Sequence, residues 1–398
     1  MLKVDRGAGA FDVVCLSHLR WNFVFQRPQH LMTRCARRRR VYFVEEPLVE
    51  TGAQPYLRIE RCEGVTVVCP VVPDGLADVA VTTAQRQLLD AFMASERITE
   101  YVLWYYTPMA LRFTDHLDPR AIVYDCMDEL SAFRDAPPML RALEADLMRR
   151  AALVFTGGQS LYAAKRHQHH NIHAFPSSVD VEHFRAARSI EHEPADQHDI
   201  ARPRLGFFGV LDERMDLALL AGVADMRPEW QLVMLGPVVK IDPASLPPRA
   251  NIHYLGGKSY RDLPQYLAGW DVALLPFARN EATRFISPTK TPEYMAAGKP
   301  VVSTSIADVV RPYGERGLVR IADDVASFVA ACELAMREDP DARIRTFDRY
   351  LTRLSWDTTW SRMLSLVNDV ALGPPHRPVV STSRAAPLPS LRARVENA

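Results

Sequence analysis

SPTKTPEYMAAGKPVVST, residues 287–304, predicts a capped helix that leads directly into a buried strand. Ser287 followed by Pro288 indicates the helix start, because a hydroxyl N-cap and a proline at the first helical position are both favoured there. Lys290 and Glu293 are three residues apart and share one helix face. A helix N-terminus attracts anions. A lysine beside it would strengthen phosphate binding, and a carboxylate one turn deeper could bind two vicinal hydroxyls. The alternative is a capped surface helix with an ordinary ion pair.

Strand-like and helix-like segments alternate on both sides of this stretch. Such alternation predicts βαβ units and parallel sheets. The expected strands are residues 12–16, 41–45, 65–71, 101–104, 122–125 and 153–156, and then 205–211, 231–236, 252–256, 271–277, 300–304 and 318–322. We therefore expect the α/β class, with two facing Rossmann-like domains and a ligand cleft beyond the carboxyl ends of their strands.

The polar stretch between the two sets of strands suggests how the chain is divided. We expect an N-terminal domain over residues 1–180, a linker over 181–203, a C-terminal domain over 204–370 and a disordered, Pro- and Arg-rich tail over 371–398. Trp356 and Trp360, four residues apart on a late helix, favour packing in a core or between domains.

Composition excludes several classes of protein. The 398 residues include 48 Lys and Arg and 48 Asp and Glu, so the formal charge is zero, which argues against a nucleic-acid partner. No apolar run approaches the ~18–20 residues of a membrane-spanning helix, and the N-terminus has no signal-peptide pattern, so we expect a cytoplasmic protein. The six cysteines form no CxxC pair, which indicates neither a zinc site nor a disulfide framework.

Three motifs resemble the retaining GT-B glycosyltransferases (group 1, family 4-like). They are RRAALVFTGGQSLYAAKR at residues 149–166, FPSSVDVEHF at residues 175–184 and the stretch at residues 287–304. SHLRW and QRPQHL near the start and YDCMDE in the middle are similar to a bacterial branch associated with cell-surface polysaccharides such as teichuronic acid. The resemblance implies the GT-B fold, with a C-terminal helix that crosses back to the first domain.

The resemblance also implies a donor site in the second domain. Glu293 occupies the position of the glutamate that holds the ribose hydroxyls. The other implied donor-binding residues are Gly209, Arg214, Lys240, Arg284, Ser287 and Lys290. Phe285 departs from the family, because many relatives have a sugar-contacting glutamate there. Glu281 or Arg284 could take over that role.

Candidate residues of the first domain follow predicted strands. His18, Arg20, Trp21 and Arg27 come after the first strand, and Asp125, Asp128 and Tyr105 lie at the ends of others. Asp128 best matches a polar family residue that faces the donor sugar. The candidate catalytic residues are therefore Asp128, His18 and Glu281, and the candidate acceptor-binding residues are Arg20, Trp21, Arg27, Asp125 and Tyr105. For the aromatic residues and the carboxylates, packing and capping are the alternatives.

The function that the resemblance implies is transfer of a hexose, with retention, from a nucleotide diphosphate-sugar, most simply a UDP-sugar. The acceptor would be a hydroxyl of a cell-surface glycan or lipid-linked acceptor, and neither metal nor cofactor is expected. The arginine run at residues 37–40 could also contact an anionic membrane peripherally. The alternatives are a nucleotide-sugar epimerase or hydrolase, in which His18 and Asp128 would act as acid and base, and an inactive scaffold subunit.

Overall fold

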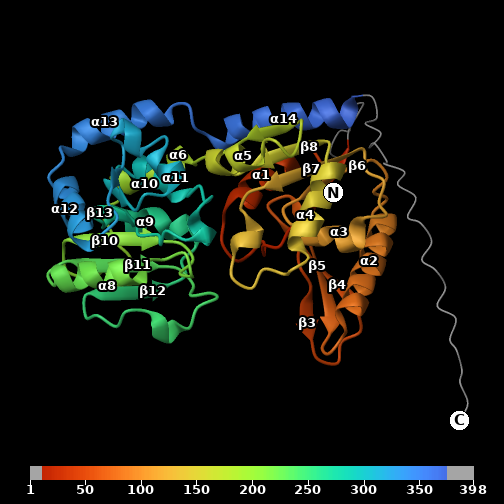
Figure 1. Cartoon of the computed structure of the whole chain (residues 1–398), viewed down its shortest axis with the longest axis horizontal. Coiled ribbons are helices and arrows are strands. Elements are labelled where there is room, and N and C mark those ends of the chain that lie inside the picture. The colour runs from red at the N-terminus through yellow and green to blue at the C-terminus, as the bar shows by residue number, and fades with distance from the viewer. Residues whose placement is uncertain (1–10, 374–398) are drawn as a thin grey trace, which may run out of the picture.

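Two parallel sheets, one in each half of the chain, organise the protein into two domains (Figure 1). The computed structural model describes residues 11–373. The tail predicted from residue 371 onwards lies almost entirely outside the described residues. No helix within residues 11–373 combines the length and apolar character needed to cross a membrane.

The first sheet has nine strands in the order β3-β5-β2-β1-β6-β7-β8-β9, with β4 paired to β5. Its strands are β1 Asp12–Leu16, β2 Val41–Val44, β3 Leu48–Glu50, β4 Tyr56–Cys62, β5 Val65–Pro73, β6 Tyr101–Tyr105, β7 Ala121–Cys126, β8 Leu153–Thr156 and β9 Ile172–Ala174. Every pairing is parallel except that of β4 with β5, which is antiparallel.

The second sheet has six parallel strands in the order β12-β11-β10-β13-β14-β15. They are β10 Arg204–Phe208, β11 Gln231–Leu235, β12 Ile252–Gly256, β13 Val272–Leu275, β14 Val301–Ser303 and β15 Arg320–Ile321. The expectation of two Rossmann-like α/β domains is confirmed.

Helices connect the strands as βαβ units require. They are α1 Arg27–Ala36, α2 Asp78–Ser95, α3 Leu111–Thr114, α4 Leu140–Arg150, α5 Gln159–Lys165, α6 Val181–Arg185, α7 Ala195–His198, α8 Leu217–Met226, α9 Leu263–Ala268, α10 Lys290–Ala296, α11 Ala307–Val310, α12 Val325–Met336, α13 Pro340–Leu351 and α14 Trp356–Leu372. The short helices α6 and α7 fall within the stretch expected to be a linker.

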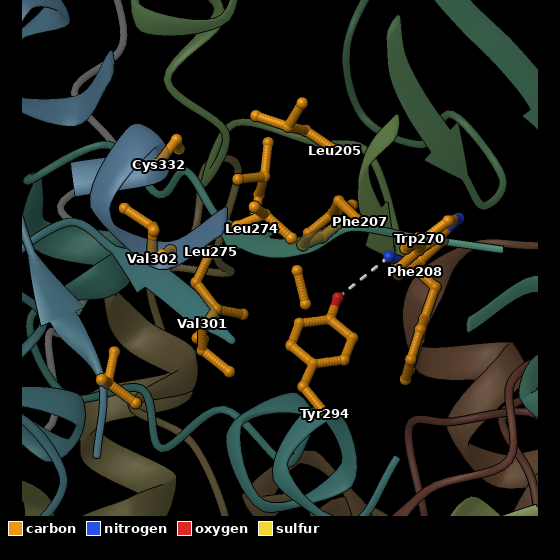
Figure 2. Close-up of a cluster of buried hydrophobic side chains, with 14 of the residues drawn as sticks. Leu205, Phe207, Phe208, Trp270, Leu274, Leu275, Tyr294, Val301, Val302 and Cys332 are labelled. Atoms are coloured by element: carbon orange, nitrogen blue, oxygen red, sulfur yellow. Dashed lines mark hydrogen bonds between the residues drawn. The ribbon is translucent and has the colours of Figure 1, made fainter. Parts of the chain in front are cut away.

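A dense apolar core holds α10 against the second sheet (Figure 2). Tyr294 of α10 is fully buried, and its ring meets the ring of Phe208 edge-on with centroids 5.1 Å apart. The Tyr294 hydroxyl also accepts a 3.1 Å hydrogen bond from the backbone N–H of Phe208. The helix α10 is therefore fixed relative to the carboxyl end of β10.

The last helix, α14, leaves the second domain and packs on the first, as the resemblance implies (Figure 1). Trp356 and Trp360 are buried in the same cluster as Trp104 of β6, and the ring centroids of Trp104 and Trp360 are 6.2 Å apart. The two tryptophans thus belong to the first-domain core, although they follow the second domain in the chain.

The arginine run after α1 is largely occupied by contacts within the protein. Arg37 binds Asp357 at 2.9 Å, Arg40 forms an ion pair with Asp12, and the Arg39 guanidinium lies 3.7 Å from the centre of the Phe11 ring. These contacts tie the end of α1 to its neighbours in the first domain.

Candidate functional site

A cavity of about 540 Å³ lies between the two domains, at the carboxyl ends of β10, β11 and β12. The loop after β1, residues 21–26, and residues 62–63 form its first-domain wall. The second-domain wall consists of Phe208, Gly209, Leu235, Gly236, Pro237, Gly257, Lys258, Ser259, Tyr260, Leu263, Thr289, Lys290 and Glu293. This is the place where open parallel sheets bind ligands.

Lys290 and Glu293 of α10 form a charged pair that lines this cavity. Glu293 is 5% exposed, and its Oε2 atom has no hydrogen-bond partner among the described residues. Burial raises the pKa of the Glu293 carboxyl, and the charge of Lys290 opposes that rise. Burial lowers the pKa of Lys290 to about 8, while Glu293 acts in the opposite direction. A buried acceptor without a donor is costly, so this oxygen is suited to receive a donor from a ligand.

The prediction that Ser287 is the N-cap of α10 is wrong. The helix α10 begins at Lys290 with Thr289 as its N-cap, and no side chain caps it. Ser287 instead lies where the two domains meet. A Cβ atom added at Gly158 of the first domain would lie 2.9 Å from Ser287 Cβ and 2.1 Å from Asp308 Oδ2, so these two residues of the second domain pack directly against Gly158. Asp308 accepts a 2.9 Å hydrogen bond from the Ser160 N–H of α5. Ser287 is therefore part of a domain contact and does not cap α10.

Two glycines allow the ends of β10 and β11 to approach each other and Lys290. At Gly209, with φ +142°, a Cβ atom would lie 2.3 Å from Lys290 Cε. At Gly236, with φ +147°, it would lie 1.7 Å from the Gly209 carbonyl oxygen. Both positions need glycine for the backbone conformation and for the space. The Lys290 ammonium is thereby held against the backbone turn that follows β10.

Arg214 and Lys240 lie beside the same turn and face the first domain. The Arg214 guanidinium and the Lys240 ammonium lie 5.6 and 5.2 Å from the centre of the Phe133 ring of the first domain. Arg214 is held by Asp212 through Nε and Nη2, at 2.9 and 2.7 Å. Its Nη1 has no hydrogen-bond partner within residues 11–373. The structure thus brings three cations, Arg214, Lys240 and Lys290, to one side of the cleft.

Asp128 faces these cations from the first domain. Burial raises the pKa of Asp128, and the positive charges of Arg214, Arg27 and Lys290 oppose that rise. Of the two other predicted catalytic residues, His18 is also near the cleft. Burial and the charge of Lys240 lower the pKa of His18 to about 4, so its imidazole is neutral at pH 7.

Three predicted acceptor ligands do not reach the cleft, and their assignment is corrected. Arg27 and Asp125 form a buried ion pair, with Nη2 2.8 Å from Oδ1 and side chains 1% and 0% exposed. Arg27 also donates to the Phe175 carbonyl oxygen at 2.6 Å. Tyr105 is fully buried, and its hydroxyl lies 2.7 Å from Thr114 Oγ1. All three stabilise the first domain from within.

Arg20 and Trp21 have different environments. Trp21 lines the cavity, is 6% exposed as a residue, and packs its ring edge-on against Phe43. Arg20 turns away from the cavity, because it binds Glu45 at 3.2 Å and the Pro47 carbonyl oxygen at 3.0 Å. Only Trp21 of the two is placed to touch a ligand in the cavity.

The segment that precedes α10 contains the departure from the family pattern. Glu281 and Arg284 form an exposed ion pair at 3.7 Å and do not line the cavity. The prediction that they replace the sugar-contacting glutamate therefore has no support in this geometry. Phe285 is partly buried and packs against a hydrophobic cluster of the first domain. An apolar side chain at this position joins the two domains.

Tyr260 is a cavity residue that sequence reasoning missed. Its ring stacks on Phe25 with centroids 4.7 Å apart and on His183 with centroids 4.4 Å apart. Its buried hydroxyl has no hydrogen-bond partner among the described residues. The charge of Glu293 adds to the effect of burial in raising the pKa of Tyr260. The sequence signal that could have identified it is the glycine-containing loop HYLGGKS at residues 253–259, which ends one residue before Tyr260.

Residues 11–373 contain no group of three or more His, Cys, Asp or Glu side chains arranged to hold a metal ion. The charged residues that line the cavity are Glu63, Lys258, Lys290 and Glu293, and Arg214, Lys240 and Asp128 lie near Lys290.

Comparisons with known proteins agree with this geometry. Residues 202–338 match the family model described as glycosyl transferases group 1. The chain is 23% identical over 288 residues to TuaH of Bacillus subtilis (strain 168), which is assigned by name to teichuronic acid biosynthesis as a glycosyltransferase. That match covers 66% of this chain and 70% of the relative.

Solved structures show the fold. A sucrose-phosphate synthase from Thermosynechococcus elongatus superposes with a TM-score of 0.65 and 12% identity, over 92% of this chain and 100% of that one. An E. coli structure titled trehalose-6-phosphate, bound with UDP-2-fluoro glucose, gives a TM-score of 0.67 and 12% identity, again over 92% and 100%. The likeness of these neighbours extends over both domains.

Proposed function

We propose that the protein transfers a hexose from a nucleotide diphosphate-sugar to an acceptor hydroxyl, and the match of residues 202–338 to the model of group 1 glycosyl transferases supports this proposal. The observation that carries the proposal is the buried Lys290–Glu293 pair, which opens into the cavity between the domains. Glu293 Oε2 accepts from a ribose hydroxyl, and the Lys290 ammonium binds the diphosphate one turn earlier on α10.

The cations at the cleft stabilise the leaving diphosphate. Charge builds on the oxygen that bridges sugar and phosphate as the glycosidic bond breaks, and positive groups already in place lower the barrier by several kcal/mol. Lys290 lies against Gly209, and the Nη1 atom of Arg214 provides a second donor. Lys240 reaches toward the first domain and closes the same side of the cleft.

The first domain supplies the acceptor side. Asp128 faces the cations across the cleft, at the position from which it contacts the sugar or the attacking hydroxyl. Trp21 and Phe25 cover the cavity and exclude water, which limits hydrolysis of the donor.

The finer assignments extend the proposal. A uridine donor is supported by the E. coli neighbour, whose title names UDP-2-fluoro glucose. A glycan or lipid-linked acceptor of the cell envelope, reached from the cytoplasm, is supported by the teichuronic acid assignment of the Bacillus relative. Retention at the anomeric carbon rests on the motifs at residues 149–166 and 287–304.

A thermal-shift panel of UDP-, GDP-, ADP- and dTDP-sugars, with and without EDTA, tests the donor site. One nucleotide class should raise the melting temperature, and EDTA should leave the shift unchanged. Glu293→Ala should weaken donor binding about tenfold to a hundredfold, the scale of a lost charge-assisted hydrogen-bond pair. Glu281→Ala is the matched control, because Glu281 is an exposed carboxylate outside the cavity.

Release of nucleoside diphosphate separates this proposal from its rivals. A transferase releases it only with acceptor, a hydrolase releases it without acceptor, and a scaffold subunit never does. Unchanged affinity in a folded Glu293→Ala variant would rule out the ribose contact.

A further inference from the structure

Strand β4 is the open edge of the first sheet. It pairs only with β5 within the described residues. Five of its seven residues are exposed, among them Ile59 at 49% and Tyr56 at 39%. A strand edge of this length presents unpaired N–H and C=O groups that can pair with another strand.

The backbone groups of Leu57, Ile59 and Arg61 point to this free edge. The Glu45 N–H donates to the Val68 carbonyl oxygen at 2.9 Å, so the backbone polar groups of Val68 in β5 face β2. Ile59 lies opposite Val68, Leu57 lies opposite Pro70, and Arg61 lies opposite Thr66. Pro70 and Thr66 are each two residues from Val68, so their backbone polar groups point to the same side of β5 as those of Val68. The β4 residues whose partners in β5 direct their N–H and C=O groups toward β2 form non-hydrogen-bonded pairs with those partners. Their own N–H and C=O groups therefore point outward.

The side chains of β4 are complementary to themselves in an antiparallel arrangement centred on Ile59. In that register Ile59 lies opposite Ile59 of a second copy, and Leu57 lies opposite Arg61. These are the residues with outward N–H and C=O groups, so they exchange backbone hydrogen bonds across the edge. On the other face of the strand, Arg58 lies opposite Glu60 of the second copy and Glu60 lies opposite Arg58. Both charges are exposed and weakly engaged, since Arg58 is 3.9 Å from Glu50 and Asn22 donates to Glu60 at 3.4 Å.

Neighbouring registers are unfavourable. A shift to one side places Arg58 opposite Arg58 of the second copy, and a shift to the other side places Glu60 opposite Glu60. Like charges directly opposite each other are destabilising. Shifts that change the phase bring outward groups against residues that bond to β5, which loses the ladder, and larger shifts that keep the phase leave at most three residues of each β4 strand paired. The charges thus select the register centred on Ile59.

We propose that β4 pairs with β4 of a second copy of this chain about a two-fold axis through Ile59, and so joins two nine-stranded sheets into one. Charged edge strands commonly prevent such pairing. In the register centred on Ile59, opposite charges face each other and the outward N–H and C=O groups of the two strands also find partners. The contact is isologous, as two-fold dimers require. Neither Lys290 nor Glu293 belongs to this interface, although β4 ends at Cys62, which lines the cavity.

Oligomeric state in solution tests the proposal, by sedimentation velocity over a concentration series of the full chain. The wild type should sediment as a dimer. Ile59→Pro removes an outward N–H and leaves the bonds to β5 intact, so it should give a folded monomer. Arg58→Glu and Glu60→Arg should each weaken dimerisation about tenfold to a hundredfold, because each turns two attractive pairs into repulsive ones.

The two charge variants also provide a rescue experiment. An equimolar mixture of Arg58→Glu and Glu60→Arg chains restores opposite charges across the edge and should give a heterodimer. The double variant, which carries both changes in one chain, should form a homodimer again. Circular dichroism confirms that each variant is folded. A wild type that stays monomeric throughout the series, or a dimer that both charge variants leave unchanged, would overturn the proposal.

Discussion

The hydroxyl of Tyr294 accepts a 3.1 Å hydrogen bond from the backbone N–H of Phe208. This bond joins α10 to the carboxyl end of β10, one residue before Gly209 (Figure 2). Tyr294 does not line the cavity, yet it sets the distance between Lys290, the cation of α10, and the glycine turn. It is therefore a positioning residue for the proposed donor site.

Tyr294→Phe should weaken both stability and donor binding. The variant leaves a buried N–H without an acceptor, which should cost about 1–3 kcal/mol in the free energy of unfolding. Donor affinity should fall by severalfold, because α10 is no longer fixed to β10. Urea unfolding and calorimetric titration measure the two effects. Tyr105→Phe, which removes an equally buried hydroxyl in the first domain, should change stability alone. Equal donor affinity in both variants would contradict the positioning role.

Donor binding should weaken as the pH rises. Burial lowers the pKa of Lys290 to about 8, so the free protein loses this positive charge above that pH. The diphosphate binds the protonated form, so affinity falls as the pH rises through the pKa of Lys290, by up to about tenfold per pH unit. Titrations from about pH 7 to about pH 10 measure the dissociation constant. Lys290→Arg keeps its charge over this range and should flatten the profile. A flat wild-type profile would show that Lys290 does not bind the diphosphate.

Gly209→Ala should block the donor site through Lys290. The added Cβ would lie 2.3 Å from Lys290 Cε, which forces the ammonium out of its place beside the turn. We expect at least a tenfold loss of donor affinity, the size of about one lost charge-assisted hydrogen bond. Gly317→Ala is the matched control, because it also has a positive φ, +68°, with open space around the position. Similar losses of affinity in the two variants would assign the effect to backbone strain.

Periodicity was sufficient to predict most of the fold, because apolar runs in parallel sheets are long and buried on both faces. The strands β1, β8 and β12 have the bounds expected from the sequence. Strand β4 was missed because charged residues stand on both of its faces, Arg58 and Glu60 on one and Arg61 on the other, and they hide the alternation. The short strands β3 and β9 offered too few residues for a pattern.

The candidate site was predictable where a sequence motif carries the residues that line it. It was not predictable where contacts between residues far apart in the sequence determine the role of a side chain. Lys290, Glu293 and Gly209 meet at the cavity. Arg27 was assigned to the acceptor because its position after a strand suggests exposure, but its partner Asp125 is 98 residues away in the sequence. Phe285 likewise has no local signal for its role, since it packs on the other domain.

The buried pair of Arg27 and Asp125 allows a direct test of that correction. Asp125→Leu leaves a buried guanidinium without its counter-charge and should cost about 3–5 kcal/mol in the free energy of unfolding. The double variant Arg27→Met/Asp125→Leu removes both charges and should recover most of that loss, because apolar side chains of similar volume often replace a buried ion pair at little cost. Urea unfolding of the wild type, both single variants and the double variant gives the coupling energy. The acceptor KM of the double variant should equal that of the wild type. A small loss of stability in Asp125→Leu, together with a raised acceptor KM in the double variant, would return these two residues to the acceptor site.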